Sequence, residues 1–180
     1  MSDDSPDRIQ EAPKEQTFED IGPVLRKLSS LGLVLVGGQA LNRWATVFLP
    51  NDALLRKDAP FTSKDIDFLG GKADVLACAR LLDGEPLLPP PDDPTPSTGL
   101  VRFKDSQGVM RTLDFLEAPY GITRSDADEM AISFDLQNPD GTETPGVLKV
   151  LHPVLCMESR VQNCVSLPGY NTPHALKQLR

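Results

Sequence analysis

The sequence predicts an α/β (or α+β) fold: a small, mixed, strongly twisted sheet with helices packed on one side and a helical element at the C-terminus. Three observations lead to this prediction. An apolar run at 33–36 meets two glycines and then an apolar helical stripe, the pattern of a buried strand followed by a helix. Segment 65–69 alternates acidic and apolar residues, as strands do. Two β-rich runs, 100–104 and 109–116, flank a turn-like tetrapeptide, as in a hairpin.

The chain of 180 residues divides into three expected parts. Residues 1–16 are polar and acidic, so we expect a disordered tail. The core is expected over 17–150 and a C-terminal helical segment over 151–180. The net charge is −8, of which residues 1–20 contribute −5. The rest of the chain is mildly acidic and lacks the basic cluster that is typical of proteins that bind long nucleic acids. This charge is compatible with a small anionic substrate that binds together with metal ions.

Composition also points to a cellular location. No apolar run approaches the roughly 20 residues that span a bilayer, and the first eight residues, MSDDSPDR, lack the regions of a signal peptide. Cys78, Cys156 and Cys164 form no C-x-x-C pair. We therefore expect buried thiols in a reducing compartment, the cytoplasm, and no membrane partner.

The first half of the core predicts two helices around one strand. Apolar residues recur at helical spacing in 18–28; Pro23 interrupts the pattern, or lies in the first turn of a helix that starts near Gly22. After the strand at 33–36, a second helix is expected, ending at Pro50. Its apolar stripe consists of Leu41, Trp44, Ala45 and Phe48. We expect Trp44 in the core, and a polar linker over 51–62.

The second half predicts the remaining strands and helices. A helix is expected at 72–82, and a proline-rich irregular loop at 83–98. Another helix is expected from Pro153, which suits a first turn, and a further helical segment at 174–180. Segment 120–142 is ambiguous apart from one strand. Strands are expected at 65–69, 100–104, 109–116, 131–136 and 147–151.

Three aspartates in these strands point to metal chemistry. Alternation places Asp65 and Asp67 on one face of their strand, with Cα atoms roughly 6.6 Å apart. Neighbouring carboxylates repel each other, and a hard cation such as Mg²⁺ (or Mn²⁺) prefers oxygen ligands and would compensate. Asp114 lies opposite the apolar face of 109–116 and could reach the same ion if the two strands pair. The alternative is a solvated polar strand face.

The glycine pair supplies the second half of a possible site. Gly37 and Gly38 would let backbone N–H groups approach a ligand closely, at the positive end of the following helix, where phosphates bind. Alternatively, the pair only tightens a turn. Together with the three aspartates, the turn forms a plausible two-metal phosphoryl-transfer site.

The motifs LVLVGGQALNRWA, TSKDIDFLG and RTLDFLE resemble the nucleotidyltransferase superfamily, which has the polymerase β-like fold. The nearest resemblance is to nucleotidyltransferase-like toxins of abortive-infection toxin–antitoxin systems. It spans 33–117, and more loosely VLHPVLCMESRVQN. It implies that Gly37 and Gly38 cradle the triphosphate of an NTP. It also implies that Asp65 and Asp67 hold both metals, and that Asp114 completes the second metal site and helps to activate the attacking hydroxyl.

This sequence departs from the family pattern in two places. The insertion at 51–62 lengthens the gap between the glycines and Asp65, and a helical lysine of related toxins is replaced by Arg160. Arg160 could bind a phosphate as a fork or solvate a helix face. Ser63 and Lys64 could also contact phosphates or be solvent-exposed.

The resulting hypothesis is transfer of a nucleoside monophosphate from an NTP to an acceptor hydroxyl on RNA, protein or a small molecule. The alternative is a non-catalytic nucleotidyltransferase-like module that binds a protein. An antitoxin is a possible partner in either case.

Overall fold

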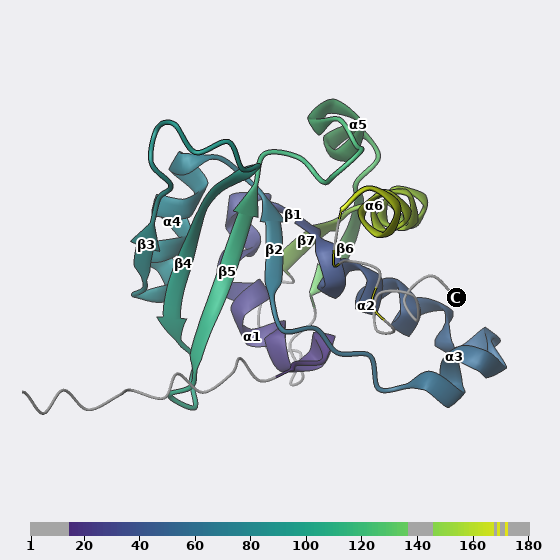
Figure 1. Cartoon of the computed structure of the whole chain (residues 1–180). Coiled ribbons are helices and arrows are strands. Elements are labelled where there is room, and N and C mark those ends of the chain that lie inside the picture. The colour runs from purple at the N-terminus through teal and green to yellow at the C-terminus, as the bar shows by residue number, and fades with distance from the viewer. Residues whose placement is uncertain (1–14, 137–145, 168, 170–171, 173–180) are drawn as a thin grey trace, which may run out of the picture.

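One seven-stranded mixed sheet organises the chain (Figure 1). The computed structural model describes residues 15–136, 146–167, 169 and 172. The strand order is β3-β4-β5-β2-β1-β7-β6; the β1–β7 and β2–β5 pairs are parallel, and the other neighbours are antiparallel. The strands are β1 (Val34–Val36), β2 (Ile66–Leu69), β3 (Glu85–Leu87), β4 (Ser97–Lys104), β5 (Met110–Leu116), β6 (Ile132–Leu136) and β7 (Gly146–Val150). The predicted α/β class and the mixed sheet are confirmed.

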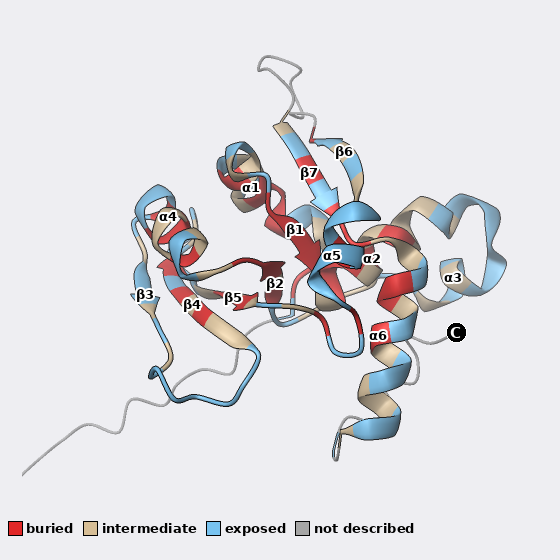
Figure 2. Ribbon diagram, turned by 90° about the horizontal axis from the view of Figure 1, so that it is seen from above, coloured by how far each residue is buried: buried red, intermediate tan, exposed pale blue. Residues whose placement is uncertain are grey.

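Helices cover both faces of the sheet, so the prediction of helices on one side is wrong. Helices α1 and α4 lie on one face, and α2 and α6 lie on the other (Figures 1 and 2). The reason is that β1 is buried throughout, and a strand apolar on both faces needs a covering layer on each. The helices are α1 (Phe18–Leu28), α2 (Gly37–Phe48), α3 (Ala53–Asp58), α4 (Lys72–Leu82), α5 (Arg124–Glu129) and α6 (Pro153–Ser166). The predicted C-terminal helix is thus present as α6.

Helix α1 begins earlier than Gly22. The Thr17 hydroxyl accepts a hydrogen bond from the Asp20 N–H at 3.2 Å, and an Asp20 carboxylate oxygen accepts one from the Thr17 N–H at 2.9 Å. This capping box satisfies two N–H groups at the helix start. Pro23 therefore lies inside the helix, and the apolar residues of 18–28 still face the core, as predicted.

Helix α2 buries a different face from the predicted stripe. Trp44 is in the core, as predicted, and its indole N–H donates to the Leu151 carbonyl at 2.8 Å. Phe48, by contrast, is 48% exposed. Gln39 and Asn42 are buried instead, which periodicity of apolar residues could not indicate. The buried polar side chains bond to each other, so their burial is compensated.

Short elements appear where the sequence suggested irregular chain. The linker 51–62 contains α3, capped by Asp52, whose carboxylate accepts from the N–H groups of Leu54 and Leu55. The proline-rich loop contains the edge strand β3 and the start of β4. The ambiguous segment holds α5 as well as the predicted strand, now β6. The helix expected at 174–180 lies outside the described residues.

Two compositional expectations can be compared with the structure. The Cys78 and Cys156 thiols are buried, and Cys164 is half-buried. Within the described ranges, no helix has both the length and the apolar character needed to cross a membrane.

Candidate functional site

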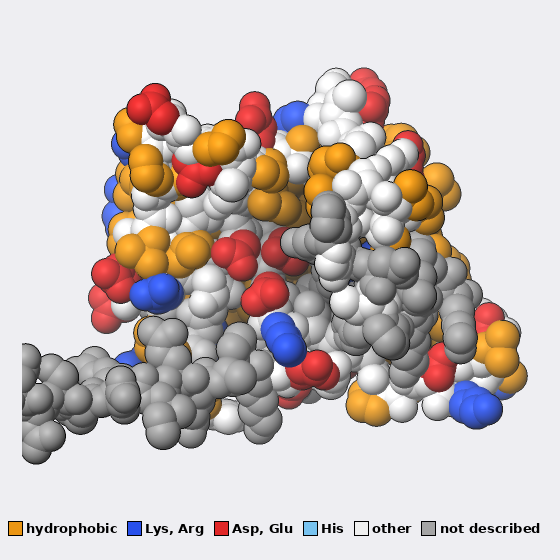
Figure 3. All heavy atoms as spheres, in the orientation of Figure 1, with side chains coloured by type: hydrophobic (Ala, Val, Ile, Leu, Met, Phe, Trp, Pro, Cys, Tyr) orange, Lys and Arg blue, Asp and Glu red, His pale blue; other side chains and the backbone are white. Residues whose placement is uncertain are grey.

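The predicted aspartates come together on one face of the sheet. Asp67 of β2 and Asp114 of β5 are register partners on neighbouring parallel strands. Asp65 lies just before β2, is exposed, and interacts electrostatically with both. Acidic side chains gather over β2 and β5 in the middle of the face shown in Figure 3. Strand pairing thus brings into one neighbourhood residues that are far apart in the chain.

Burial and mutual repulsion favour the protonated form of these carboxyl groups. Burial, then the charges of Asp114 and Asp65, raise the pKa of Asp67 to about 7. Burial, then Asp65, also raise the pKa of Asp114. The Arg160 charge and a hydrogen bond from the Gly38 N–H oppose the rise at Asp67. The Arg160 charge thus offsets only part of the repulsion among the three carboxyl groups, and a bound cation would offset the rest.

The two glycines at the start of α2 fit against Asp67. Gly37 has a φ of +64°, and a Cβ at this position would overlap the Asp67 carboxylate. The Gly38 N–H donates to that carboxylate, while Val36, the residue at the helix cap, has no side-chain cap. Asp67 from β2 thus takes the place of an N-cap side chain for α2. This contact was not predicted; phosphate binding by Gly37 and Gly38 stays a prediction.

Arg160 reaches the same site from α6. Helix α6 packs against α2. Burial raises the pKa of the Cys156 thiol to about 12, and the Arg160 charge opposes this rise, as it opposes the rise at Asp67. Its Nε atom is buried and has no hydrogen-bond partner among the described residues. A buried, unpaired guanidinium nitrogen is costly, and Arg160 can offer this donor to an anion next to Asp67.

Ser63 and Lys64 occupy different surroundings. Ser63 is half-buried, and its backbone pairs with Gln16 in an isolated bridge. Lys64 is exposed. The sequence analysis suggested that both residues, close to Asp65 in the chain, could contact phosphates. In the structure, the Ser63 backbone is paired with Gln16. Phosphate binding by either residue stays a prediction.

Of the predicted features, the metal site is the one whose residues the structure brings together least. Among the residues that the structure describes, no group of three or more His, Cys, Asp or Glu side chains is arranged to hold a metal ion. The donor chemistry nevertheless suits Mg²⁺ or Mn²⁺, because all three candidates are carboxylates. Asp67 and Asp114 are already neighbours, so Asp65 is the residue whose position matters most.

The sequence analysis missed a buried polar group beside the site. Gln39 follows the glycine pair directly, is fully buried, and donates to the Gln16 carbonyl at 3.1 Å. Asn42 donates to the Gln39 side-chain oxygen at 3.2 Å. A signal was present: the two amides of Gln39 and Asn42 lie at i and i+3, so they share one face of the helix.

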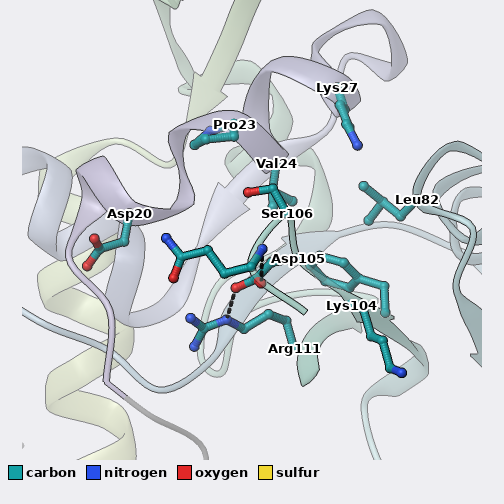
Figure 4. Close-up of a pocket in the computed structure, with 11 residues that line it drawn as sticks. Asp20, Pro23, Val24, Lys27, Leu82, Lys104, Asp105, Ser106 and Arg111 are labelled. Atoms are coloured by element: carbon teal, nitrogen blue, oxygen red, sulfur yellow. Dashed lines mark hydrogen bonds and ion pairs between the residues drawn. The ribbon is translucent and has the colours of Figure 1, made fainter. Parts of the chain in front are cut away.

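A pocket of about 150 Å³ lies on the other face of the sheet, between α1 and the β4–β5 turn (Figure 4). Arg111 and Asp105 form an ion pair of 2.9 Å in its wall. Arg111 and Asp114 are three positions apart on β5, so their side chains point to opposite faces. The pocket's lining includes none of the predicted site residues.

Comparisons of the chain with protein-family models, curated proteins and solved structures found no match. The geometry of the site is therefore the basis of the proposal that follows.

Proposed function

We propose that the protein is a metal-dependent nucleotidyltransferase that moves a nucleoside monophosphate from an NTP to an acceptor hydroxyl. The observation that carries the proposal is the register pairing of Asp67 and Asp114 beside the first turn of α2. Two carboxylates, the start of α2 and the buried, unpaired Nε atom of Arg160 then meet at one place. These groups suit a triphosphate that arrives with cations.

The residues divide into two roles in this proposal. Asp65, Asp67 and Asp114 would hold Mg²⁺ or Mn²⁺, which neutralises charge on the phosphate oxygens. Arg160 would bind a phosphate oxygen through its buried Nε–H. The exposed Lys64 would contribute at the open side. The metal ions would offset the negative charge of the aspartates and of the triphosphate together.

The chemical step needs a base and an oriented hydroxyl. The acceptor oxygen forms a bond to the α-phosphorus, and the bond from that phosphorus to the bridging oxygen breaks, releasing pyrophosphate. Asp114 would take the hydroxyl proton.

The test is transfer of label from each α-labelled NTP with Mg²⁺ or Mn²⁺. Purified protein is incubated with total RNA, with a protein extract and without acceptor. Asp67→Asn should lose transfer by at least a hundredfold, yet stay folded, because the amide oxygen still accepts from Gly38. Asp128→Asn on α5 is the matched control: it also removes one carboxylate, in an exposed ion pair with Arg124, and should transfer like wild type.

Each outcome has a defined meaning. Label transferred by wild type and by Asp128→Asn alone supports the proposal, and the labelled species gives the acceptor class. Full transfer by a folded Asp67→Asn protein contradicts it. If no label moves and no metal-dependent NTP binding appears, the proposal fails in favour of a non-catalytic protein-binding module.

A further inference from the structure

Hydrogen bonds between buried groups join the first turn of α2 to the segment that leads into β2. The Gln39 amide nitrogen donates to the Gln16 carbonyl at 3.1 Å, and Asn42 donates to the Gln39 oxygen at 3.2 Å. Gln16 and Ser63 then exchange two backbone hydrogen bonds of 2.9 Å. Of the four buried polar residues among those described, this network includes three, Gln16, Gln39 and Asn42. Buried polar groups concentrated in one network fix the positions of the segments that they join.

The segment that this network holds carries Asp65. The β2 ladder begins at Ile66, so its strand pairing fixes Asp67 but not Asp65. Before Ile66, the backbone is paired at Ser63, two residues from Asp65. The neighbouring Thr62 hydroxyl donates to the Glu15 carboxylate at 2.7 Å. The hydrogen bonds of Ser63 and Thr62 therefore go to residues 15 and 16 and not to the sheet, and Gln39 bonds residue 16 to α2.

We propose that Gln39 is a positioning residue. It holds the Gln16–Ser63 bridge against α2, and thereby sets where Asp65 stands relative to Asp67 and Asp114. Gln39 also follows Gly38, so one side chain ties the helix end that contacts Asp67 to the chain that presents Asp65. The consequence for metal binding rests on the proposed function; the claim about position does not.

The test uses Gln39→Met in the full chain, because methionine fills similar space without either hydrogen bond. Hydrogen exchange measured by NMR should show the Ser63 amide exchanging about tenfold faster, since its acceptor loses its anchor. The amides of Phe68 and Leu69, within β2, should keep their protection. Mn²⁺ binding, followed by electron paramagnetic resonance without nucleotide, should weaken about tenfold or more, as for residues that orient metal ligands.

Trp44→Phe is the matched control. It removes another buried hydrogen bond of the same helix, the one to the Leu151 carbonyl, and this bond has no link to Ser63. Ser63 exchange and Mn²⁺ affinity should stay at wild-type values in Trp44→Phe. Asn42→Ala keeps the Gln39–Gln16 bond and should change both readouts in the same direction as Gln39→Met, but by less. If Gln39→Met does not fold, Asn42→Ala replaces it in the test.

The outcomes separate this inference from the proposed function. If Ser63 exchange in Gln39→Met does not exceed that in Trp44→Phe, the positioning role is overturned. Faster Ser63 exchange with unchanged Mn²⁺ affinity overturns the consequence for metal binding, because the bridge would then not set the position of Asp65 as a ligand. If wild type binds Mn²⁺ neither alone nor with NTP, the proposed function fails, while Ser63 exchange still decides whether Gln39 holds the bridge.

Discussion

Gly37 leaves the space that the Asp67 carboxylate occupies. The glycine at the first position of α2 and the aspartate on β2 are so close that a Cβ at position 37 would overlap the carboxylate. Val36 and Asp67 are register partners in the β1–β2 pair, which brings the start of α2 to Asp67. The missing side chain at Gly37 thus lets the Gly38 N–H reach Asp67 as a cap.

This contact predicts a large cost for Gly37→Ala. Gly32 is the matched control, because its φ of +65° is almost the same as the +64° of Gly37, but a Cβ there would meet nothing within 4 Å. Gly32→Ala should cost about 1–2 kcal/mol for backbone conformation alone. Gly37→Ala should cost about 1–3 kcal/mol more, from overpacking. Urea unfolding of both variants checks this prediction. Equal losses of unfolding free energy would show that the Asp67 side chain moves away from a Cβ at position 37 at little cost.

Asp67→Asn should stabilise the metal-free protein at pH 8. The pKa of Asp67 is about 7 in the folded protein, above its ordinary value of 3.8. Between these values the folded protein keeps a proton that the unfolded chain has lost, so the free energy of unfolding of wild type falls as pH rises. Asparagine does not titrate, so its advantage should grow from pH 4.5 to pH 8, by about 3 kcal/mol.

Urea unfolding at both pH values, in the presence of a chelator, tests this stability prediction. Asp128→Asn is again the control, and its stability difference from wild type should be much less dependent on pH. An Asp67→Asn advantage that is the same at pH 4.5 and pH 8 would mean that the Asp67 pKa is not raised.

Mn²⁺ affinity should depend on pH in the opposite sense to stability. A carboxylate must lose its proton to bind the ion, and Asp67 does so only near pH 7. The affinity should therefore rise about tenfold per pH unit below pH 7 and level off above it. Titrations from pH 5.5 to pH 8.5 measure the curve, and a flat curve would exclude Asp67 as a ligand.

Arg160 should set the midpoint of that curve. Its charge lowers the pKa of Asp67, so Arg160→Met should move the midpoint above the wild-type value. Arg160→Lys keeps the charge and should restore most of the shift, even though the guanidinium fork is lost. The same titrations provide the measurement. Identical midpoints in all three proteins would show that Arg160 acts on Asp67 only weakly.

Local patterns were enough to predict most of the sheet. The apolar run before Gly37 became β1, and the period-two alternation around Asp67 and Asp114 became β2 and β5, because side chains alternate between the faces of a strand. Short helices such as α3 escaped prediction, since a cap at Asp52 is a weaker signal than a long periodic stripe.

The sequence by itself determined most of the strands, that Asp67 shares a strand face with Asp65, and that Asp114 lies opposite Leu113 and Phe115. Only the tertiary structure decided that β2 and β5 are parallel neighbours, that α2 and α6 cover the opposite face from α1 and α4 (Figure 2), and that Gln39 is buried against Gln16. Periodicity is a property of adjacent residues. Strand pairing and the burial of an amide depend on partners distant in the chain, whose hydrogen bonds compensate for the lost water.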